Sequence, residues 1–128
     1  MRVHERRATR ETIEISKDLM AASSTPIVLA ILADGDSYGY AILQRVRDLS
    51  GGRMAWTDGM LYPVLHRLER LAFVEARWET AQSGRRRKYY RITPGGRAQL
   101  VEERRQWHAV DATLRGIWRT LSLLPQGA

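Results

Sequence analysis

Four consecutive cations, residues 85–88, form the part of this chain that is best suited to bind an anion. Ser83 and Gly84 come directly before them and indicate an exposed turn. Neighbouring positive charges repel one another, so an anionic partner would remove an electrostatic cost. The alternative is a turn that is merely solvated. Small residues and hydrogen-bond donors occur together here, which favours a phosphate-binding tip.

A second group of polar side chains falls on one face of a predicted helix that is capped by Thr57. The apolar residues of this helix recur at helical spacing and define an inward face: Leu61, Val64, Leu65, Leu68 and Leu71. The outward face then carries Gly59, Tyr62, Pro63, His66, Arg67 and Arg70. A phenol, an imidazole and guanidinium groups with little apolar surface are typical of a contact face, and arginine can bond guanine at two points.

Two strands and further helices are predicted to position these groups. Strand character in residues 73–79 and 87–92 places the cations at the tip of a β-hairpin. Upstream, residues 26–33 predict a buried helix that starts at Pro26, after a short helical turn within residues 15–22. Residues 38–49 predict a helix capped by Ser37 and ended by glycines 51 and 52, with Ile42, Val46 and Leu49 on its apolar face. Gly39, in its first turn, is compatible with the close approach of another helix or of a phosphate, and close packing is the favoured interpretation.

The last helix, which Thr93 caps and Pro94 starts, carries an apolar stripe. Leu100, Trp107, Leu114 and Leu121 lie seven residues apart, and Val110, Ile117 and Leu124 form a second series with the same spacing. Such a stripe predicts a partner helix, although the helix could also pack back on its own domain. We expect a homodimer whose interface contains Leu100, Trp107, Val110, Leu114, Ile117 and Leu121.

The composition limits the class of protein. The 128 residues suffice for one domain with an appendage, and 19 arginines and two lysines give a net charge of +7. This balance suits a polyanion, but nucleic acid, a membrane surface and an acidic protein all remain open. The longest apolar run, residues 26–33, is far shorter than the ~20 residues of a membrane span. Residues 1–11 contain no apolar signal segment. We therefore expect a soluble, cytoplasmic protein.

No combination of residues predicts catalysis, a metal site or a cofactor. Cysteine is absent, which excludes disulfides and thiolate chemistry. The three histidines, at positions 4, 66 and 108, lack the spacing of a metal site, and no zinc-protease, phosphate-loop or serine-nucleophile motif occurs. A binding protein is expected rather than an enzyme.

Several runs of the sequence together resemble the PadR-like family of bacterial transcriptional regulators. They are DGDSYGYAIL at 34–43, SGG at 50–52, TDGMLYPVLHRLE at 57–69 and SGRRRKYYRITPGGR at 83–97. The resemblance covers about residues 16–107 and implies a mainly α fold with a small β-hairpin, a winged helix-turn-helix. It further implies a repressor that binds palindromic operators as a dimer through its last helix. The chain is similar to the short members of the family, which have a single terminal helix.

The resemblance also implies roles for parts of the chain and for single residues. From their arginine content, residues 1–15 are expected to form a basic arm along DNA or a merely solvated terminus; the resemblance implies the DNA-binding domain at 16–93 and the dimerisation helix at 94–128. Carried over by match, the implied DNA contacts are Tyr62, Pro63, His66, Gly84, Arg85, Arg86 and Lys88. Their neighbours on the same helix and turn complete the expected site: Thr57, Gly59, Arg67 and Ser83. Trp107 is similar in position to a residue that lines an aromatic-ligand cavity in some short members, although core packing also explains it.

Two other functions remain compatible with these residues. A winged helix can serve as a protein–protein interaction module, but such a module would not need cations at both the tip and the helix face. A non-specific DNA-binding architectural protein would use the same basic hairpin.

Overall fold

The computed structural model describes residues 13–121 of the chain. The predicted basic arm is therefore described only from residue 13 onwards. Leu124 and the last residues of the predicted dimerisation helix lie outside the described residues. In chain order the elements are α2 (Lys17–Ala22), α3 (Ser24–Ala33), β1 (Ser37–Tyr38), α4 (Gly39–Leu49), α5 (Asp58–Arg70), β2 (Val74–Thr80), β3 (Arg86–Ile92) and α6 (Pro94–Thr120).

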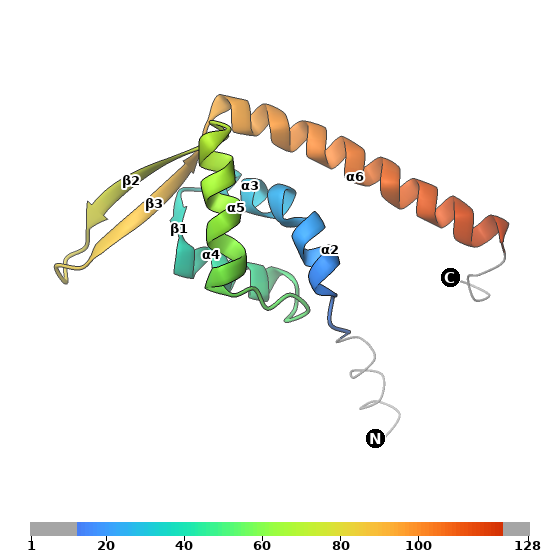
Figure 1. Ribbon diagram of the computed structural model, residues 1–128, viewed down its shortest axis with the longest axis horizontal. Helices are drawn as coiled ribbons and strands as arrows, with labels where there is room; N and C mark the ends of the chain where they lie inside the picture. The colour runs from blue at the N-terminus through green and yellow to red at the C-terminus, as the bar shows by residue number, and fades with distance from the viewer. Residues whose placement is uncertain (1–12, 122–128) are drawn as a thin grey trace, which may run out of the picture.

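The core lies where α3, α4 and α5 meet one face of the β-hairpin. Helix α3 is apolar on almost every side, and it buries Val28, Leu29, Ile31 and Leu32. Helix α5 contributes Leu61, Val64, Leu65 and Leu68, and the hairpin contributes Val74, Tyr90 and Ile92. The hairpin and α6 leave this core in opposite directions (Figure 1). The predicted fold class, mainly α with a small β-hairpin and a long last helix, is confirmed.

The hairpin is part of a three-stranded antiparallel sheet, because β1 pairs with β3 on the side away from β2. Ser37 lies opposite Tyr90 and Tyr38 lies opposite Tyr89. The prediction that Ser37 caps a helix starting at Tyr38 is therefore wrong, since α4 begins at Gly39 and its N-cap, Tyr38, makes no side-chain cap bond. Ser37 and Tyr38, which were predicted as the cap and the first residue of this helix, instead pair with β3.

Three further details differ from the sequence expectation. Leu71 is exposed rather than inward-facing, because α5 ends at Arg70 and Leu71 is already its C-cap. Leu49, the last residue of α4, is exposed as well. Helix α3 starts at Ser24, so Pro26 is its third residue rather than its first. Proline is still tolerated there, because the first four N–H groups of a helix have no partner within it.

A tight junction joins the end of α5 to the start of α6. Thr93 donates its hydroxyl to the carbonyl of Ala72 at 2.7 Å and accepts from the N–H of Gly96 at 3.0 Å. A Cβ atom on Gly96 would lie 2.1 Å from the carbonyl oxygen of Phe73, so only glycine fits at this position. The orientation of α6 is therefore fixed against the segment that ends α5.

Candidate nucleic-acid interface

Helix α5 presents its polar face to solvent, as its apolar spacing predicts. Tyr62, Pro63, His66 and Arg67 are all exposed, while the leucines and valine of the opposite face are buried. Thr57 is the N-cap of this helix but makes no side-chain cap bond, and Asp58 lies in the first turn. A carboxylate there interacts favourably with the positive end of the helix dipole. Pro63 lies inside the helix, where it removes one backbone hydrogen bond.

The ring of Tyr62 packs onto the first residue of α4. A Cβ atom on Gly39 would lie 2.2 Å from the Tyr62 hydroxyl oxygen and 2.8 Å from its ring carbon Cζ. The close packing expected at Gly39 is thus confirmed, and the neighbour is a predicted DNA contact. Tyr62 is 38% exposed, and its ring centroid lies 6.5 Å from that of His66. These two side chains form one continuous polar and aromatic surface on α5.

Arg67 lies apart from this surface. Its Nη2 donates to the Oγ1 atom of Thr25 in α3 at 2.5 Å. It also lines a cavity of about 160 Å³ between α2, α3 and α5, together with Trp56 and Met60. The structure therefore does not bring Arg67 together with the other residues expected to contact DNA.

The wing is the hairpin of β2 and β3 with the turn between them. Val74 faces Ile92 at its base, and Thr80 faces Arg86 at its tip. Within the turn, the N–H of Ala81 donates to Arg85 at 2.8 Å, and that of Gly84 donates to Ala81 at 2.9 Å. Gly84 has a φ of +87°, a conformation that glycine adopts without strain. Ser83, Gly84 and Arg85 are all exposed in this turn, as predicted.

The sequence predicted that the four consecutive cations all lie at the tip, and this prediction is wrong. Successive residues of a strand point to opposite faces, so Arg86 and Lys88 lie on one face of the wing and Arg87 on the other. Arg86 lies 4.9 Å over the ring of Trp78, and Arg87 lies 4.6 Å over that of Tyr38. The Nζ atom of Lys88 is 3.8 Å from a carboxylate oxygen of Glu69 in α5. Of the four cations, only Arg85 and Arg86 are exposed, and Arg87 and Lys88 are half-buried.

A groove of about 630 Å³ separates the wing from α5 and the start of α4. It brings together the two groups that sequence analysis singled out, the polar face of α5 and the cations of the hairpin. Its lining residues are Tyr38, Gly39, Tyr40, Tyr62, His66, Trp78, Arg85, Arg86, Arg87, Lys88 and Tyr90. The lining contains four cations and no carboxylate, so the groove is suited to an anionic polymer. Tyr38, Tyr40 and Trp78 were not predicted as site residues. The position of Trp78 in the predicted strand before the basic turn was the sequence signal that could have indicated one of them.

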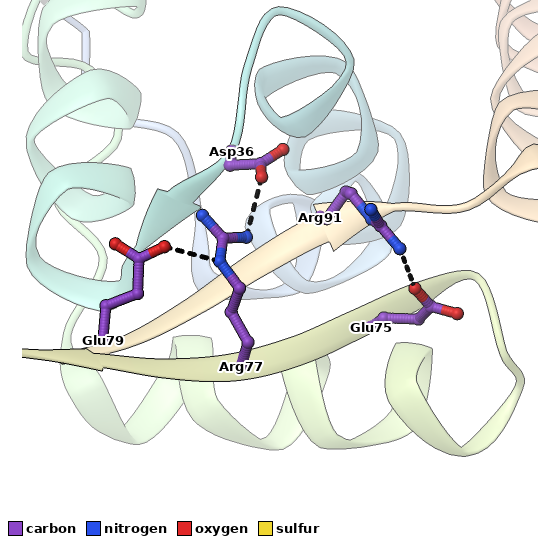
Figure 2. A network of polar contacts seen from close by, with 5 residues as sticks. All are labelled: Asp36, Glu75, Arg77, Glu79 and Arg91. Atoms are coloured by element: carbon purple, nitrogen blue, oxygen red, sulfur yellow. Dashed lines mark hydrogen bonds and ion pairs between the residues drawn. The ribbon is translucent and has the colours of Figure 1, made fainter.

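The opposite face of the sheet is charge-balanced (Figure 2). Arg77 of β2 bonds Glu79 at 2.6 Å and Asp36, in the loop before β1, at 2.8 Å. These bonds, that to Glu79 first, raise the pKa of the Arg77 guanidinium above its ordinary value. Arg91 pairs with Glu75, which lies directly opposite it in the β2–β3 register. Arg77 and Arg91 on this face are therefore paired with carboxylates, whereas Arg85 and Arg86, which line the groove, form no ion pair within residues 13–121.

Tyr90 forms the floor where the groove meets the core. The side chain is 1% exposed, and within residues 13–121 its hydroxyl has no hydrogen-bond partner. Burial, followed by the nearby negative charge of Glu69, raises the pKa of Tyr90 to about 12. Tyr90 is therefore neutral at physiological pH.

Helix α6 carries its apolar stripe largely into solvent. Val110, Leu114, Ile117 and Leu121 are exposed, and Trp107 is half-buried. Leu100, which was expected in the same interface, packs partly against the core of its own domain. Four of the six residues predicted for the dimer interface thus form an uncovered apolar surface.

No helix within residues 13–121 is both long and apolar enough to cross a lipid bilayer. In the same range, no three histidine, aspartate or glutamate side chains gather as metal ligands would.

Comparison with known proteins identifies relatives of the chain. The transcriptional regulator Rv3488 of Mycobacterium tuberculosis is 38% identical over 78 residues, which are 61% of this chain and 69% of that protein. An uncharacterised protein of Lysinibacillus sphaericus is 32% identical over 96 residues, which are 75% of this chain and 88% of that protein.

Solved structures show the same arrangement of elements. A transcriptional regulator from Clostridium thermocellum aligns with a TM-score of 0.73 at 27% identity, over 78% of this chain and 97% of that one. A PadR family transcriptional regulator from Eggerthella lenta aligns with a TM-score of 0.72 at 29% identity, over 80% of this chain and 88% of that one.

The sequence profile of the transcriptional regulator PadR-like family matches residues 28–102, a segment that runs from α3 through the wing into α6. This match covers more than half of the chain, and it includes the groove with every residue that lines it. The family consists of transcriptional regulators, so the expectation that the chain is not an enzyme is confirmed. The chain belongs to the PadR-like family of winged-helix transcriptional regulators.

Proposed function

We propose that this regulator is a homodimeric repressor that binds a palindromic operator in duplex DNA. The observation that carries the proposal is the groove, since it joins an outward helix face to a cationic wing face without any carboxylate in its lining. Within each protomer, α5 enters the major groove and reads base edges. The wing lies on the adjacent sugar–phosphate backbone. A regulator that binds chromosomal DNA in this way acts in the cytoplasm.

The division of labour between α5 and the wing follows from their side chains. Tyr62 and His66 present hydrogen-bonding groups on rigid rings, which suits them to distinguish bases in the major groove. Thr57 and Gly59, at the N-terminal end of α5, have small side chains or none, which allows this end of the helix to approach the DNA closely, and Pro63 lies farther along the same helix. Arg85 and Arg86 supply affinity that does not depend on sequence, because they neutralise phosphates and release counterions. Lys88, held near Glu69, contributes less free charge than its sequence position suggests.

Dimerisation through α6 is supported by the exposed stripe of Val110, Leu114, Ile117 and Leu121. Apolar residues at heptad spacing pack between the residues of a facing helix, and this packing removes their apolar surface from water. Two copies of α5 would then face successive major grooves on one side of the DNA, so half-sites lie roughly 10 bp apart or at a multiple of that distance.

Regulation would act on the angle between the two α6 helices. Because Thr93 and Gly96 hold α6 tightly against the end of α5, a change in that angle changes the distance between the two recognition helices. A small aromatic ligand bound beside Trp107 at the dimer interface would shift the equilibrium if it bound one arrangement more tightly. The half-buried indole of Trp107 supports this position for an effector.

Gel retardation of a mixture of random duplexes at low salt tests the proposal against a protein–protein module. A DNA-binding regulator retards the duplexes, and the retarded fraction falls steeply as salt rises. Retention of free DNA mobility at all salt concentrations would contradict the proposal. Competition with bulk DNA then separates a repressor from an architectural protein, since only the repressor retains a preferred duplex.

A further inference from the structure

Trp78 is an exposed indole in the middle of a cationic groove. It lies on β2, is 57% exposed, and lines the groove together with Tyr62 and His66 of α5. Large aromatic side chains are favourable when they bury much of their surface against a partner. Within residues 13–121, however, the packing around Trp78 leaves more than half of its surface exposed to solvent. The position of Trp78 therefore indicates a contact with a molecule that enters the groove.

Arg86 holds the indole in a defined geometry. Thr80 is the register partner of Arg86, and Trp78 lies two residues before Thr80 in β2. Trp78 and Arg86 are therefore diagonal neighbours on one face of the hairpin. The guanidinium carbon lies 4.9 Å from the centroid of the Trp78 ring. A guanidinium that stacks its flat face on the ring keeps its N–H edge free to donate. Within residues 13–121 no carboxylate forms an ion pair with Arg86.

Charge and shape together select the molecule that enters. The cations around Trp78 attract a polyanion, and the indole adds an apolar platform that phosphate groups alone cannot use. A DNA strand presents both chemistries in alternation, because each phosphate is flanked by a deoxyribose whose C–H groups form an apolar face. Since the bases of a duplex are paired and stacked, a strand that lies between α5 and the wing offers its sugars rather than its bases to the indole.

We propose that Trp78 and Arg86 form one composite contact for the sugar–phosphate strand of duplex DNA. The indole packs on a deoxyribose, and the guanidinium held over it donates to the neighbouring phosphate. This inference rests on the proposed function, in which the wing binds DNA, and adds a non-ionic component to that binding. The component favours a sugar–phosphate polymer over other polyanions of equal charge.

Titration of the protein with a duplex of about three helical turns tests the contact by tryptophan fluorescence and by affinity. Duplex DNA should protect Trp78 from quenching by acrylamide, and this protection should be absent in Trp78→Phe and present in Trp118→Phe. Inorganic polyphosphate, which has no sugars, should bind without giving the same protection. Equal protection by polyphosphate, or protection that persists in Trp78→Phe, would overturn the proposal.

Affinity measurements at several salt concentrations separate the two side chains. Trp78→Ala should weaken duplex binding about fivefold or more, the lower range for loss of one aromatic stacking contact, with an unchanged salt slope. Arg86→Ala should lower the slope by about one. The double variant should lose less than the sum of the two, because the indole positions the guanidinium. Additive effects would overturn the composite contact.

The controls keep this inference distinct from the proposed function. If duplex binding is strong and salt-dependent but Trp78→Ala and Trp78→Phe both match the native chain, only the composite contact is wrong. If the native chain does not bind duplex DNA at all, the proposed function is wrong. Circular dichroism of Trp78→Ala establishes that its wing remains folded, and Trp78→Phe provides the fluorescence readout with an aromatic ring still in place.

Discussion

The hydroxyl oxygen of Tyr62 lies 2.2 Å from the point that a Cβ atom on Gly39 would occupy. The first residue of α4 therefore determines where the aromatic side chain of α5 can rest. Tyr62 is also a lining residue of the groove between α5 and the wing. Its position in the groove thus depends on a glycine in a different helix.

Gly39→Ala should displace the Tyr62 ring and weaken DNA binding about tenfold, which corresponds to about 1.4 kcal/mol. The new methyl group would overlap the hydroxyl and the ring, and insertion of a methyl into a packed site costs about 1–3 kcal/mol. Fluorescence anisotropy with a labelled duplex measures the affinity, and urea unfolding measures the stability. Gly116→Ala is the matched control, because nothing lies within 4 Å of a Cβ atom there. Equal affinity of Gly39→Ala and the native chain would show that Tyr62 does not contact DNA.

Replacing Arg85 and Arg86 together by alanine should weaken binding to every duplex and reduce the slope of log affinity against log salt by about two. The reason is that each exposed guanidinium neutralises about one phosphate. Arg91→Ala is the control, since Arg91 lies on the opposite face of the wing and is paired with Glu75. An unchanged slope in the double variant would remove the tip of the wing from the phosphate-binding role.

Leu114→Glu should dissociate the dimer, because it places a charge in the exposed apolar stripe of α6. Sedimentation velocity measures the oligomeric state over a range of concentrations. Ala112→Glu introduces the same charge at an exposed position outside the heptad series and should leave the dimer intact. A full dimer in Leu114→Glu would mean that another surface of the chain forms the interface.

Tyr90→Phe should leave the protein equally stable or slightly more stable at neutral pH. Its hydroxyl is buried without a hydrogen-bond partner among residues 13–121, and burial of such a group is unfavourable. The pKa of Tyr90 is raised to about 12 from the usual value of 10.0, so the folded state retains its proton longer than the unfolded state. The free energy of unfolding should therefore decrease between pH 10.0 and about 12 in the native chain, and less so in the variant.

Urea unfolding of both proteins at a series of alkaline pH values measures this difference. A loss of more than about 1 kcal/mol at neutral pH in Tyr90→Phe would show that the hydroxyl is hydrogen-bonded after all. The same variant should retain its affinity for duplex DNA, since the hydroxyl is buried beneath the groove rather than exposed in it.

The helices and the hairpin follow from local chemistry that the sequence displays directly. Apolar spacing predicts the buried face of α5, and Thr93 and Pro94 mark the start of α6 where the structure has it. Strand β1 could not be predicted, because two residues have no periodicity and their extended conformation depends on pairing with Tyr89 and Tyr90. The bond from Arg77 to Asp36 was missed with it, since the pairing of β1 with β3 brings Asp36 within reach of the Arg77 side chain.

The groove contains many of the residues that the sequence singled out, but their arrangement could not be predicted. Four consecutive cations indicated an anion-binding tip, but strand alternation sends Arg87 to the other face, and Glu69 draws Lys88 toward α5. Arg67 faces outward by helical spacing, yet its long side chain reaches Thr25. The directions of these side chains depend on hydrogen-bond acceptors and carboxylates from distant parts of the chain, which helical or strand spacing alone does not predict.

Selection of bound duplexes from a random library tests the central claim most directly, because the proposed dimer would read DNA with two copies of α5 at a fixed spacing. We expect enrichment of a palindrome whose half-sites lie roughly 10 bp apart, or a multiple of that distance. In the same experiment Leu114→Glu should enrich at most a single half-site. Binding by the native chain without enrichment of any sequence, or enrichment of a motif without two-fold symmetry, would contradict the account.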